Sequence, residues 1–292
     1  MTKVNYVVAI PSYKRPETLR DKTLQILKQY HIDPKKIDIF VANKEEEKIY
    51  KETLDPKSYN KIIVGVINLG PQRNFISNYY PEGKHIVNID DDIQGFIEYT
   101  TTNKRHEKPL ANLEKIIQEG FNECKAHGFR LWGVYPIPNG YFMEKKVDTD
   151  LRYIIGCFYG IINTKKIKLE LKNDKEDYER SIRYYIADGG VIRLRHVAPK
   201  TAYYTEKGGI QEFRSESTVM AGAKWIVKEF PEYATLNLTK KSGYAEVRLR
   251  DRTKKMSEGI RTKKMSERKK SVKHKMSEGK KSVKHKTLKK KK

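Results

Sequence analysis

Three consecutive aspartates, Asp90, Asp91 and Asp92, follow directly after the apolar run at residues 85–89. Carboxylates this close repel one another, and burying one of them unpaired is costly. A divalent cation would relieve the repulsion, because Mg²⁺ and Mn²⁺ bind carboxylate oxygens together with substrate phosphates. Side chains alternate along an extended chain, so Asp90 and Asp92 face one side. The spacing predicts a metal site at Asp90 and Asp92; the alternative is a surface loop or a helix cap.

Polar residues after two earlier apolar runs could hold a nucleotide. Pro11 ends the first run, and "PSYKRP" then supplies the Ser12 hydroxyl and the Arg15 guanidinium. A base and a ribose could bind there, although Ser12 could equally cap the next helix while Arg15 stays solvated. Asn43 and Glu45 follow the second run and are candidates to read the edge of a base.

A further candidate site lies just before the aspartates. The stretch "NLGPQRNF" places Gly70, Arg73 and Asn74 at the start of an expected helix. A helix N-terminus carries partial positive charge, and an arginine adds a full one. This combination favours a phosphate-bearing ligand.

The elements that must position these residues alternate along the first hundred residues. Strand-like runs rich in branched residues cover 4–11, 37–43, 61–67 and 84–90. Helix-like runs cover 16–30, 44–54 and 71–80. This alternation predicts an α/β fold, a Rossmann-like and mostly parallel sheet with helices on both faces. In such sheets ligands bind beyond the carboxyl ends of the strands, where all the candidate residues above fall.

The second half of the chain is less regular. We expect helices at 110–128 and 175–190, and strands at 153–163 and 191–198. The stretch at 131–143 combines prolines and glycines with aromatics, which suits a loop-rich binding surface. Its aromatic residues could stack on an acceptor or pack in the core: Trp132, Tyr135, Tyr141 and Phe142. Gly208 and Gly209 could begin a mobile loop over the ligand.

The net charge of +24 is concentrated near the end of the chain. Residues 248–292 hold 21 Lys and Arg against 4 Asp and Glu, and repeat "KMSEG" and "KKSVKHK". We predict one domain over 1–252, with a donor half at about 1–100 and an acceptor half at about 101–252. The stretch 253–292 is a low-complexity basic tail expected to be disordered. Such a tail suits nucleic-acid phosphates, with solubilisation or nuclear targeting as the alternative.

The sequence argues against several classes of protein and site. Cys124 and Cys157 form no CxxC pair, so both are expected in the core, and a zinc site or disulfide framework is not expected. The longest apolar run, 153–162, is too short to span a membrane. We expect a soluble intracellular protein, in the cytoplasm or a host nucleus. A nucleotidyltransferase would be expected to carry a glycine-rich, lysine-containing phosphate loop near the first strand, and "AIPSYKRP" has no glycine.

In order, "VVAIPSYKRPETL", "VANKEEE", "NLGPQRNF" and "NIDDDI" resemble the GT-A-type glycosyltransferases that use nucleotide sugars. Over residues 4–209 the chain is most similar to the TET/JBP-associated, base-J glucosyltransferase-like group of phages and large DNA viruses. The resemblance implies a UDP-sugar donor held by the first half, with Asp90 and Asp92 as the DxD motif. It leaves open whether Asp91 contacts the metal or the sugar and ribose.

The resemblance also implies catalytic residues. "KEDYERSIRYY" resembles an element of inverting enzymes in which the aspartate is the general base, here Asp177 beside Glu176. An ion-paired surface helix is the alternative. A late histidine completes the metal shell in some relatives, which makes His196 a candidate ligand, although a lone histidine is more often structural.

The implied reaction is hexosyl transfer, with inversion favoured over retention. The implied acceptor is 5-hydroxymethylpyrimidine in DNA, with protein or glycan acceptors still open. A catalytically silent nucleic-acid-binding protein on a transferase scaffold is the rival from another class.

Overall fold

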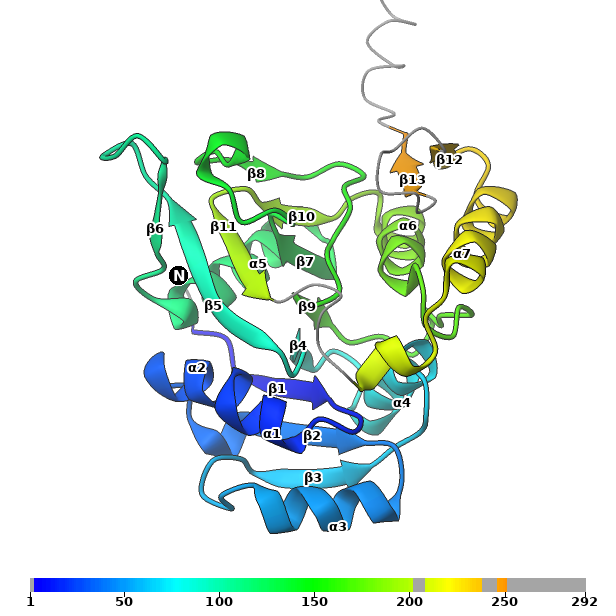
Figure 1. The fold of residues 1–292 in the computed structure, drawn as a ribbon. Helices are drawn as coiled ribbons and strands as arrows, with labels where there is room; N and C mark the ends of the chain where they lie inside the picture. Colours follow the sequence, from blue (N-terminus) through cyan, green and yellow to red (C-terminus); the bar gives the residue numbers. More distant parts are fainter. Residues whose placement is uncertain (1–2, 202–207, 238–245, 251–292) are drawn as a thin grey trace, which may run out of the picture. The chain divides into compact units, whose positions relative to one another are not determined.

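The structure is a computed structural model that describes residues 3–201, 208–237 and 246–250. The basic tail predicted at 253–292 lies outside the described residues. Figure 1 shows the arrangement of the strands and helices. The strands are β1 (Tyr6–Pro11), β2 (Ile37–Val41), β3 (Lys61–Val64), β4 (His85–Ile89), β5 (Ile93–Tyr99), β6 (Glu107–Pro109), β7 (Leu131–Val134), β8 (Val147–Asp148), β9 (Phe158–Ile162), β10 (Ile192–Leu194), β11 (Val197–Thr201), β12 (Ala234–Asn237) and β13 (Glu246–Leu249). The helices are α1 (Pro16–Asp21), α2 (Thr23–Gln29), α3 (Lys44–Thr53), α4 (Leu69–Tyr79), α5 (Leu113–His127), α6 (Glu176–Asp188) and α7 (Glu216–Glu229), with short 3₁₀ turns η1 (Pro34–Lys36), η2 (Gly140–Phe142) and η3 (Gly209–Glu212).

The main sheet contains eight strands of the described chain in the order β3-β2-β1-β4-β9-β7-β10-β8. The strands β3, β2, β1 and β4 are parallel, as the alternation along the first hundred residues predicts. β9 runs antiparallel between β4 and β7, while β10 is parallel to β7 and β8 is antiparallel to β10. The predicted α/β fold with a mostly parallel sheet is confirmed.

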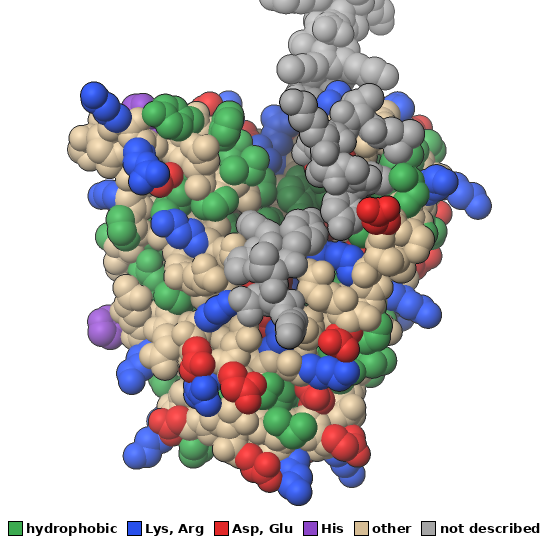
Figure 2. Space-filling model, viewed as in Figure 1, with side chains coloured by type: hydrophobic (Ala, Val, Ile, Leu, Met, Phe, Trp, Pro, Cys, Tyr) green, Lys and Arg blue, Asp and Glu red, His purple; other side chains and the backbone are tan. Residues whose placement is uncertain are grey.

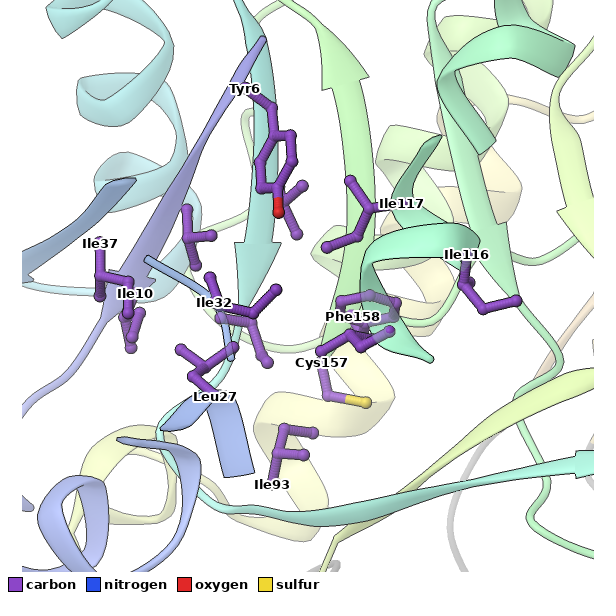
Figure 3. Close-up of a cluster of buried hydrophobic side chains, with 14 of the residues drawn as sticks. Tyr6, Ile10, Leu27, Ile32, Ile37, Ile93, Ile116, Ile117, Cys157 and Phe158 are labelled. Atoms are coloured by element: carbon purple, nitrogen blue, oxygen red, sulfur yellow. The ribbon is translucent and has the colours of Figure 1, made fainter. Parts of the chain in front are cut away.

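Helices cover both faces of this sheet, because successive strand residues point to opposite sides. Val8 and Ile10 of β1 pack in one buried cluster with side chains of α1, α2, α3 and α5. Ala9, between them, packs in a second cluster with side chains of α4 and α6. Figure 3 shows part of the first cluster, in which Ile10, Leu27 and Ile117 come from a strand and two helices.

A smaller antiparallel sheet, β11-β5-β6, begins at the aspartates. β5 starts at Ile93, directly after Asp92, and Ile93 pairs with Thr201 at the end of β11. At the other end of this pairing, Val197 lies opposite Glu98. The small sheet therefore extends from the aspartates, next to Ile93 and Thr201, to its other end at Glu98 and Val197.

Several details differ from the sequence prediction. The helix expected at 16–30 is two helices, because the backbone at Lys22 (φ −118°, ψ −88°) leaves the helical region. The run at 191–198 is two strands, β10 and β11. Trp132 lies in β7 and is fully buried, so it is a core residue and not part of a binding loop. Both cysteines are buried in the core, as predicted.

Trp132 fits because glycines on two neighbouring elements leave room for its ring. A Cβ at Gly120 of α5 would lie 2.3 Å from the indole, and one at Gly160 of β9 would lie 2.1 Å from it. Both distances are shorter than carbon contacts allow. Within the ranges that the structure describes, no helix is long and apolar enough to cross a membrane.

Candidate active site

Two adjoining pockets open beyond the carboxyl ends of the strands. The first, here the apolar pocket, has an open volume of about 600 Å³ and is lined by Pro11, Ser12, Tyr13, Arg15, Ala42, Val66, Ile67, Asn68, Leu69, Gln72, Asp90, Asp91, Asn173, Gly209, Ile210 and Phe213. The second, here the carboxylate pocket, has about 810 Å³ and is lined by Arg15, Leu69, Asp90, Asp92, Tyr153, Ile155, Gly156, Cys157, Asn173, Lys175, Glu176, Asp177, Thr201, Ile210, Gln211 and Arg214. They meet at Arg15, Leu69, Asp90, Asn173 and Ile210. The position matches the edge of the sheet that the sequence predicts for a ligand.

The apolar pocket is closed on one side by η3 and the residues around it. The Phe213 ring stacks on the Tyr13 ring, with centroids 6.0 Å apart and planes inclined by 19°. Lys14 and Glu212 form an exposed ion pair at 3.0 Å. Gly209 donates its backbone N–H to the Tyr13 carbonyl at 2.9 Å. The predicted glycine loop is therefore seated on the β1–α1 loop; its motion stays a prediction.

Two glycines are needed for this seating. Gly208 and Gly209 have φ values of +79° and +59°, a region that glycine adopts without strain. The Gly208 carbonyl accepts a hydrogen bond from Arg15 Nη2 at 2.8 Å. A Cβ at Gly209 would lie 2.8 Å from Arg15 Cζ, so a larger residue would displace the guanidinium.

Asp91 is buried and holds the β1–α1 loop in place. Its carboxylate accepts hydrogen bonds from Ser12 Oγ at 2.6 Å and from Arg15 Nη1 at 3.2 Å. Burial raises the pKa of Asp91 to about 6, although Arg15 and Ser12 oppose the shift. Ser12 therefore does not cap α1, and Arg15 is buried instead of solvated. Both residues, with Pro11, line the apolar pocket as the sequence predicts for a ligand edge.

Asp90 and Asp92 both line the carboxylate pocket. Asp91 and Asp92 lie in the turn between β4 and β5, so the alternation expected for an extended chain does not apply to them. Asp90 Oδ1 accepts a hydrogen bond from Arg73 Nη2 at 2.6 Å. Asp92 Oδ2 lies 3.7 Å from Arg15 Nη1. Burial, together with the negative charges of Asp90 and Asp91, raises the pKa of Asp92 to about 7. Three aspartates therefore share two arginines, Arg15 and Arg73.

This excess of carboxylates over arginines fits a divalent cation. Among the described residues, no group of three His, Cys, Asp or Glu side chains is arranged to hold a metal by itself. Mg²⁺ commonly binds through one or two carboxylates and takes its other ligands from substrate phosphates and water. Asp90 and Asp92 match that requirement, and their metal ligation stays a prediction.

Glu176 and Asp177 begin α6 and line the opposite wall of the carboxylate pocket. Glu176 is buried, and Arg180 Nη1 donates to its Oε2 at 2.7 Å. Burial raises the pKa of Glu176 to about 7. Asp177 is half-buried, and the Tyr153 hydroxyl donates to its Oδ2 at 2.5 Å. A side chain at the neighbouring Gly156 would press on Glu176, because a Cβ there would lie 3.0 Å from Glu176 Oε1.

One buried aromatic ring connects the two carboxylate walls. Arg180 Cζ lies 3.7 Å from the centroid of the Tyr159 ring, and Arg73 Cζ lies 5.3 Å from it. Each arginine holds one pocket carboxylate, Glu176 or Asp90. Arg73 therefore lies behind the pocket as the partner of Asp90, although the sequence suggests a direct phosphate contact.

Two other predicted ligand residues have structural partners. Asn43 caps α3, its side chain accepting a hydrogen bond from the Glu46 N–H at 2.9 Å. Asn74 exchanges two hydrogen bonds with the backbone of Leu169, at 2.8 and 2.9 Å. Neither residue lines either of these two pockets, whereas Ala42 beside Asn43 lines the apolar pocket.

Gly70 also serves close packing. Its N–H donates to the Lys172 carbonyl at 2.7 Å, and a Cβ at this position would lie 1.9 Å from the Leu171 carbonyl oxygen. The start of α4 consequently lies against the segment before α6. Its neighbour Leu69, and not Gly70 itself, lines both pockets.

His196 lies away from the carboxylate pocket. It precedes β11, and its carbonyl accepts a hydrogen bond from the Tyr99 N–H at 2.8 Å. Its Nε2 lies 3.4 Å from Glu119 Oε1 of α5. Thr201, at the pocket, is five residues further along the strand, which corresponds to about 16 Å. The geometry gives no support to His196 as a third ligand beside Asp92.

The structure adds pocket residues that the sequence did not single out. The Tyr153 hydroxyl donates a hydrogen bond to Asp177. Asn173 lines both pockets, and its Oδ1 accepts a hydrogen bond from the Leu69 N–H at 2.9 Å. Arg214 follows η3, and its Nε donates to the buried Asp174 at 2.8 Å. Asn173 and Arg214 could have been suspected from their positions in the sequence. Asn173 lies just before the predicted catalytic pair, and Arg214 follows the predicted glycine loop.

No family model matches the chain, and neither does any curated protein. Similar solved structures include S. aureus TarS 1–349 in complex with UDP, with 14% identity and a TM-score of 0.47 over 77% of this chain and 66% of that chain. Another is 4-diphosphocytidyl-2C-methyl-D-erythritolsynthase from Anaerococcus prevotii, with 12% identity and a TM-score of 0.38 over 76% of this chain and 96% of that one. The chain spans just under two thirds of the TarS 1–349 chain. Similarity at this level leaves the function to be argued from the site.

Proposed function

We propose that this chain is a metal-dependent glycosyltransferase that moves a sugar from a nucleotide sugar to an acceptor hydroxyl. One observation carries the proposal: an apolar pocket and a carboxylate pocket meet at Asp90 and Arg15. A nucleotide sugar has the same division, since the flat faces of its base pack on apolar side chains, its diphosphate is anionic and its reacting carbon lies beyond the diphosphate. The UDP-linked donor implied by the sequence resemblance belongs to this proposal.

The donor would bind with its nucleoside in the apolar pocket. Val66 and Ile67 line this pocket and are 39% and 45% exposed, so a bound base would cover apolar surface there. Phe213 forms the facing wall. Asp91 has both carboxylate oxygens engaged by the β1–α1 loop, so its role is to shape this pocket.

The diphosphate would lie at the boundary of the two pockets. Arg15, Lys175 and Arg214 line the carboxylate pocket and provide positive charge beside it. A divalent cation held by Asp90 and Asp92 would supply further charge for the departing diphosphate. Electrostatic stabilisation of this kind acts strongly in a partly water-excluded pocket.

Asp177 is the candidate general base. Its carboxylate takes the proton of the acceptor hydroxyl as that oxygen attacks the anomeric carbon, and the bond from the anomeric carbon to the diphosphate breaks. Tyr153 orients the carboxylate through its 2.5 Å hydrogen bond. Attack from the side opposite to the diphosphate inverts the anomeric centre, as the sequence resemblance implies.

The acceptor favoured by the resemblance is a 5-hydroxymethylpyrimidine in DNA, with protein or glycan hydroxyls as the alternatives. The basic tail would then raise the local concentration of DNA without taking part in the chemistry. A silent nucleic-acid-binding scaffold is less consistent with the site, because two buried arginines hold pocket carboxylates that a scaffold has no need for.

The test is to incubate the protein with a panel of nucleotide sugars and Mn²⁺, with and without hydroxymethylated DNA, and to measure release of nucleoside diphosphate. We expect release from one donor class and its loss in Asp92→Ala. Asp21→Ala, which removes an exposed aspartate of α1, is the matched control. No release from any donor, or equal release by Asp92→Ala, contradicts the proposal.

A further inference from the structure

A surface on the acceptor half presents exposed aromatic and basic side chains together. We name it the aromatic-basic surface and define it by Lys104, Arg105, Tyr141, Phe142, Lys145 and Lys146. Tyr141 is 69% exposed and Phe142 is 55% exposed, the largest values among the exposed apolar side chains of the described chain. Figure 2 shows hydrophobic side chains beside Lys and Arg at the upper left, over the region of β6 and η2 in Figure 1.

The fold imposes this exposure. Met143, the next residue, is only 2% exposed and packs with Ile97 and Ala198 of the small sheet. Asn139 caps the turn η2 by accepting a hydrogen bond from the Tyr141 N–H at 3.0 Å. The turn is therefore anchored from below while its two aromatic side chains point outward.

The turn also packs against the loop between β5 and β6. A Cβ at Gly140 would lie 2.2 Å from the Arg105 carbonyl oxygen, so only glycine allows this approach. The Tyr141 ring contacts the His106 ring edge-on at 5.8 Å. The two loops consequently form one continuous surface.

The basic residues of this surface are available to a partner. Lys104, Arg105, Lys145 and Lys146 are exposed, and none forms an ion pair with a carboxylate in the described part of the chain. Their neighbours differ, because Lys108 pairs with Glu98 at 2.9 Å and Arg195 pairs with Glu144 at 2.9 Å. Four unpaired cations around two exposed aromatic rings match a polyanion that also offers aromatic faces.

Nucleic acid has that chemistry, and unpaired bases have it in a form that aromatic side chains can reach. Proteins hold single strands by combining positive charge along the backbone with stacking of bases on aromatic rings. A protein partner with an acidic rim would meet the charges but would make no special use of the rings. The combination therefore favours a single-stranded segment of DNA or RNA.

The surface is separated from the carboxylate pocket by the length of β5. This strand runs from Ile93, next to Asp92, to Tyr99 beside His106, which corresponds to about 20 Å. A small acceptor in the pocket cannot touch a surface that far away, whereas a polymer can occupy both. We propose that the aromatic-basic surface docks a single-stranded stretch of a nucleic-acid acceptor, an inference that rests on the proposed transferase function.

The test uses the full chain and a fluorescently labelled single-stranded oligonucleotide of mixed sequence, with affinity measured by anisotropy. We expect the double variant Tyr141→Ala/Phe142→Ala to bind about tenfold more weakly, the equivalent of one lost stacking contact. Lys104→Glu/Arg105→Glu is expected to lower the affinity and the salt dependence of binding. The charge-matched control is Lys44→Glu/Lys48→Glu, which changes two exposed lysines of α3. It is expected to bind the oligonucleotide nearly as the wild type does.

Unchanged affinity in the aromatic double variant overturns the proposal. So does an equal loss in the α3 control, which would indicate unspecific attraction by net charge. A change of oligomeric state in sedimentation with unaltered oligonucleotide affinity would also overturn it, and would make the surface a protein contact. Release of nucleoside diphosphate from the donor is measured in the same variants without nucleic acid. If all variants release it while oligonucleotide affinity is unchanged, this inference fails and the transferase function stands. If neither the wild type nor any variant releases it, the transferase function fails.

Discussion

Arg73 Nη2 lies 2.6 Å from Asp90 Oδ1, behind the carboxylate that both pockets share. The same arginine donates to the Gly156 carbonyl at 3.0 Å and to Asn88 Oδ1 at 3.2 Å. The planar guanidinium uses several donors at once, which a lysine ammonium cannot reproduce. Arg73 thus fixes the orientation of Asp90 relative to the segment before β9.

Replacing Arg73 tests this relationship. We expect Arg73→Met to lower the free energy of unfolding by about 1–3 kcal/mol, because two buried acceptors, Asn88 Oδ1 and the Gly156 carbonyl, and the half-buried Asp90 lose their donor. Arg73→Lys is expected to fall between this variant and the wild type. Urea unfolding followed by circular dichroism measures the effect, with Arg20→Met, which breaks an exposed pair, as the control. If Arg73→Met has the same free energy of unfolding as the wild type, the hydrogen bonds of Arg73 do not stabilise the fold.

The raised pKa of Glu176 makes a pH prediction. The folded state keeps the Glu176 proton up to about pH 7, whereas the unfolded chain releases it near the ordinary value of 4.5. Stability from this group is therefore present below about pH 4.5 and is lost as the pH rises to about 7. Glu176→Gln cannot ionise, so its unfolding free energy relative to the wild type should rise by about 2 kcal/mol between pH 5 and pH 8.

Urea titrations at several pH values measure that difference, with Glu45→Gln on the exposed side of α3 as the matched loss of one carboxylate. A difference between Glu176→Gln and the wild type that stays constant with pH contradicts burial as the cause of the shift.

The role of Asp177 predicts a specific kinetic pattern. Asp177→Asn keeps the size of the side chain and removes the base, so kcat should fall by about 10²–10⁴-fold. Tyr153→Phe removes only the orienting hydrogen bond and should cost less. Titration calorimetry with UDP is expected to give wild-type affinity for both variants, since neither lines the apolar pocket. Weaker UDP binding together with normal kcat would assign Asp177 to donor binding.

The stacked wall of the apolar pocket predicts the opposite pattern. Phe213→Ala removes the partner of Tyr13 and one face of the pocket, so UDP affinity should drop about tenfold. Phe142→Ala removes an equally large aromatic residue outside both pockets and serves as the control. If the two variants bind UDP alike, the nucleoside does not occupy this pocket.

The parallel half of the fold follows from local pattern, and the rest does not. Runs of branched residues separated by amphipathic helices specify β1 to β4 within about ninety residues, with short connections. The position of β9 depends on pairing between residues 85–89 and 158–162, a contact across the whole second quarter of the chain. Its antiparallel direction has no local sequence signal.

The candidate site shows the same limit. Ser12, Arg15 and the aspartates can be placed from the sequence because each directly follows a strand of the parallel half. Asn43 and Asn74 carry the same chemical group. Asn43 caps the helix that it precedes, a local contact with the Glu46 N–H, whereas Asn74 binds the backbone of Leu169, which only the folded chain brings near. His196 is suggested by the resemblance and not by a local pattern; the turn between β10 and β11 that carries it lies at the end of β11 away from the aspartates.

The most direct measurement of sugar transfer is the mass of the acceptor after incubation with nucleotide sugar and Mn²⁺. The acceptor panel contains a hydroxymethylated oligonucleotide, a protein and an oligosaccharide. We predict that one acceptor gains the mass of one sugar with the wild-type chain, and that the gain is lost in Asp92→Ala and in Asp177→Asn. If no acceptor gains mass with any donor, or if both variants transfer as well as the wild type, this site is not a glycosyltransferase site.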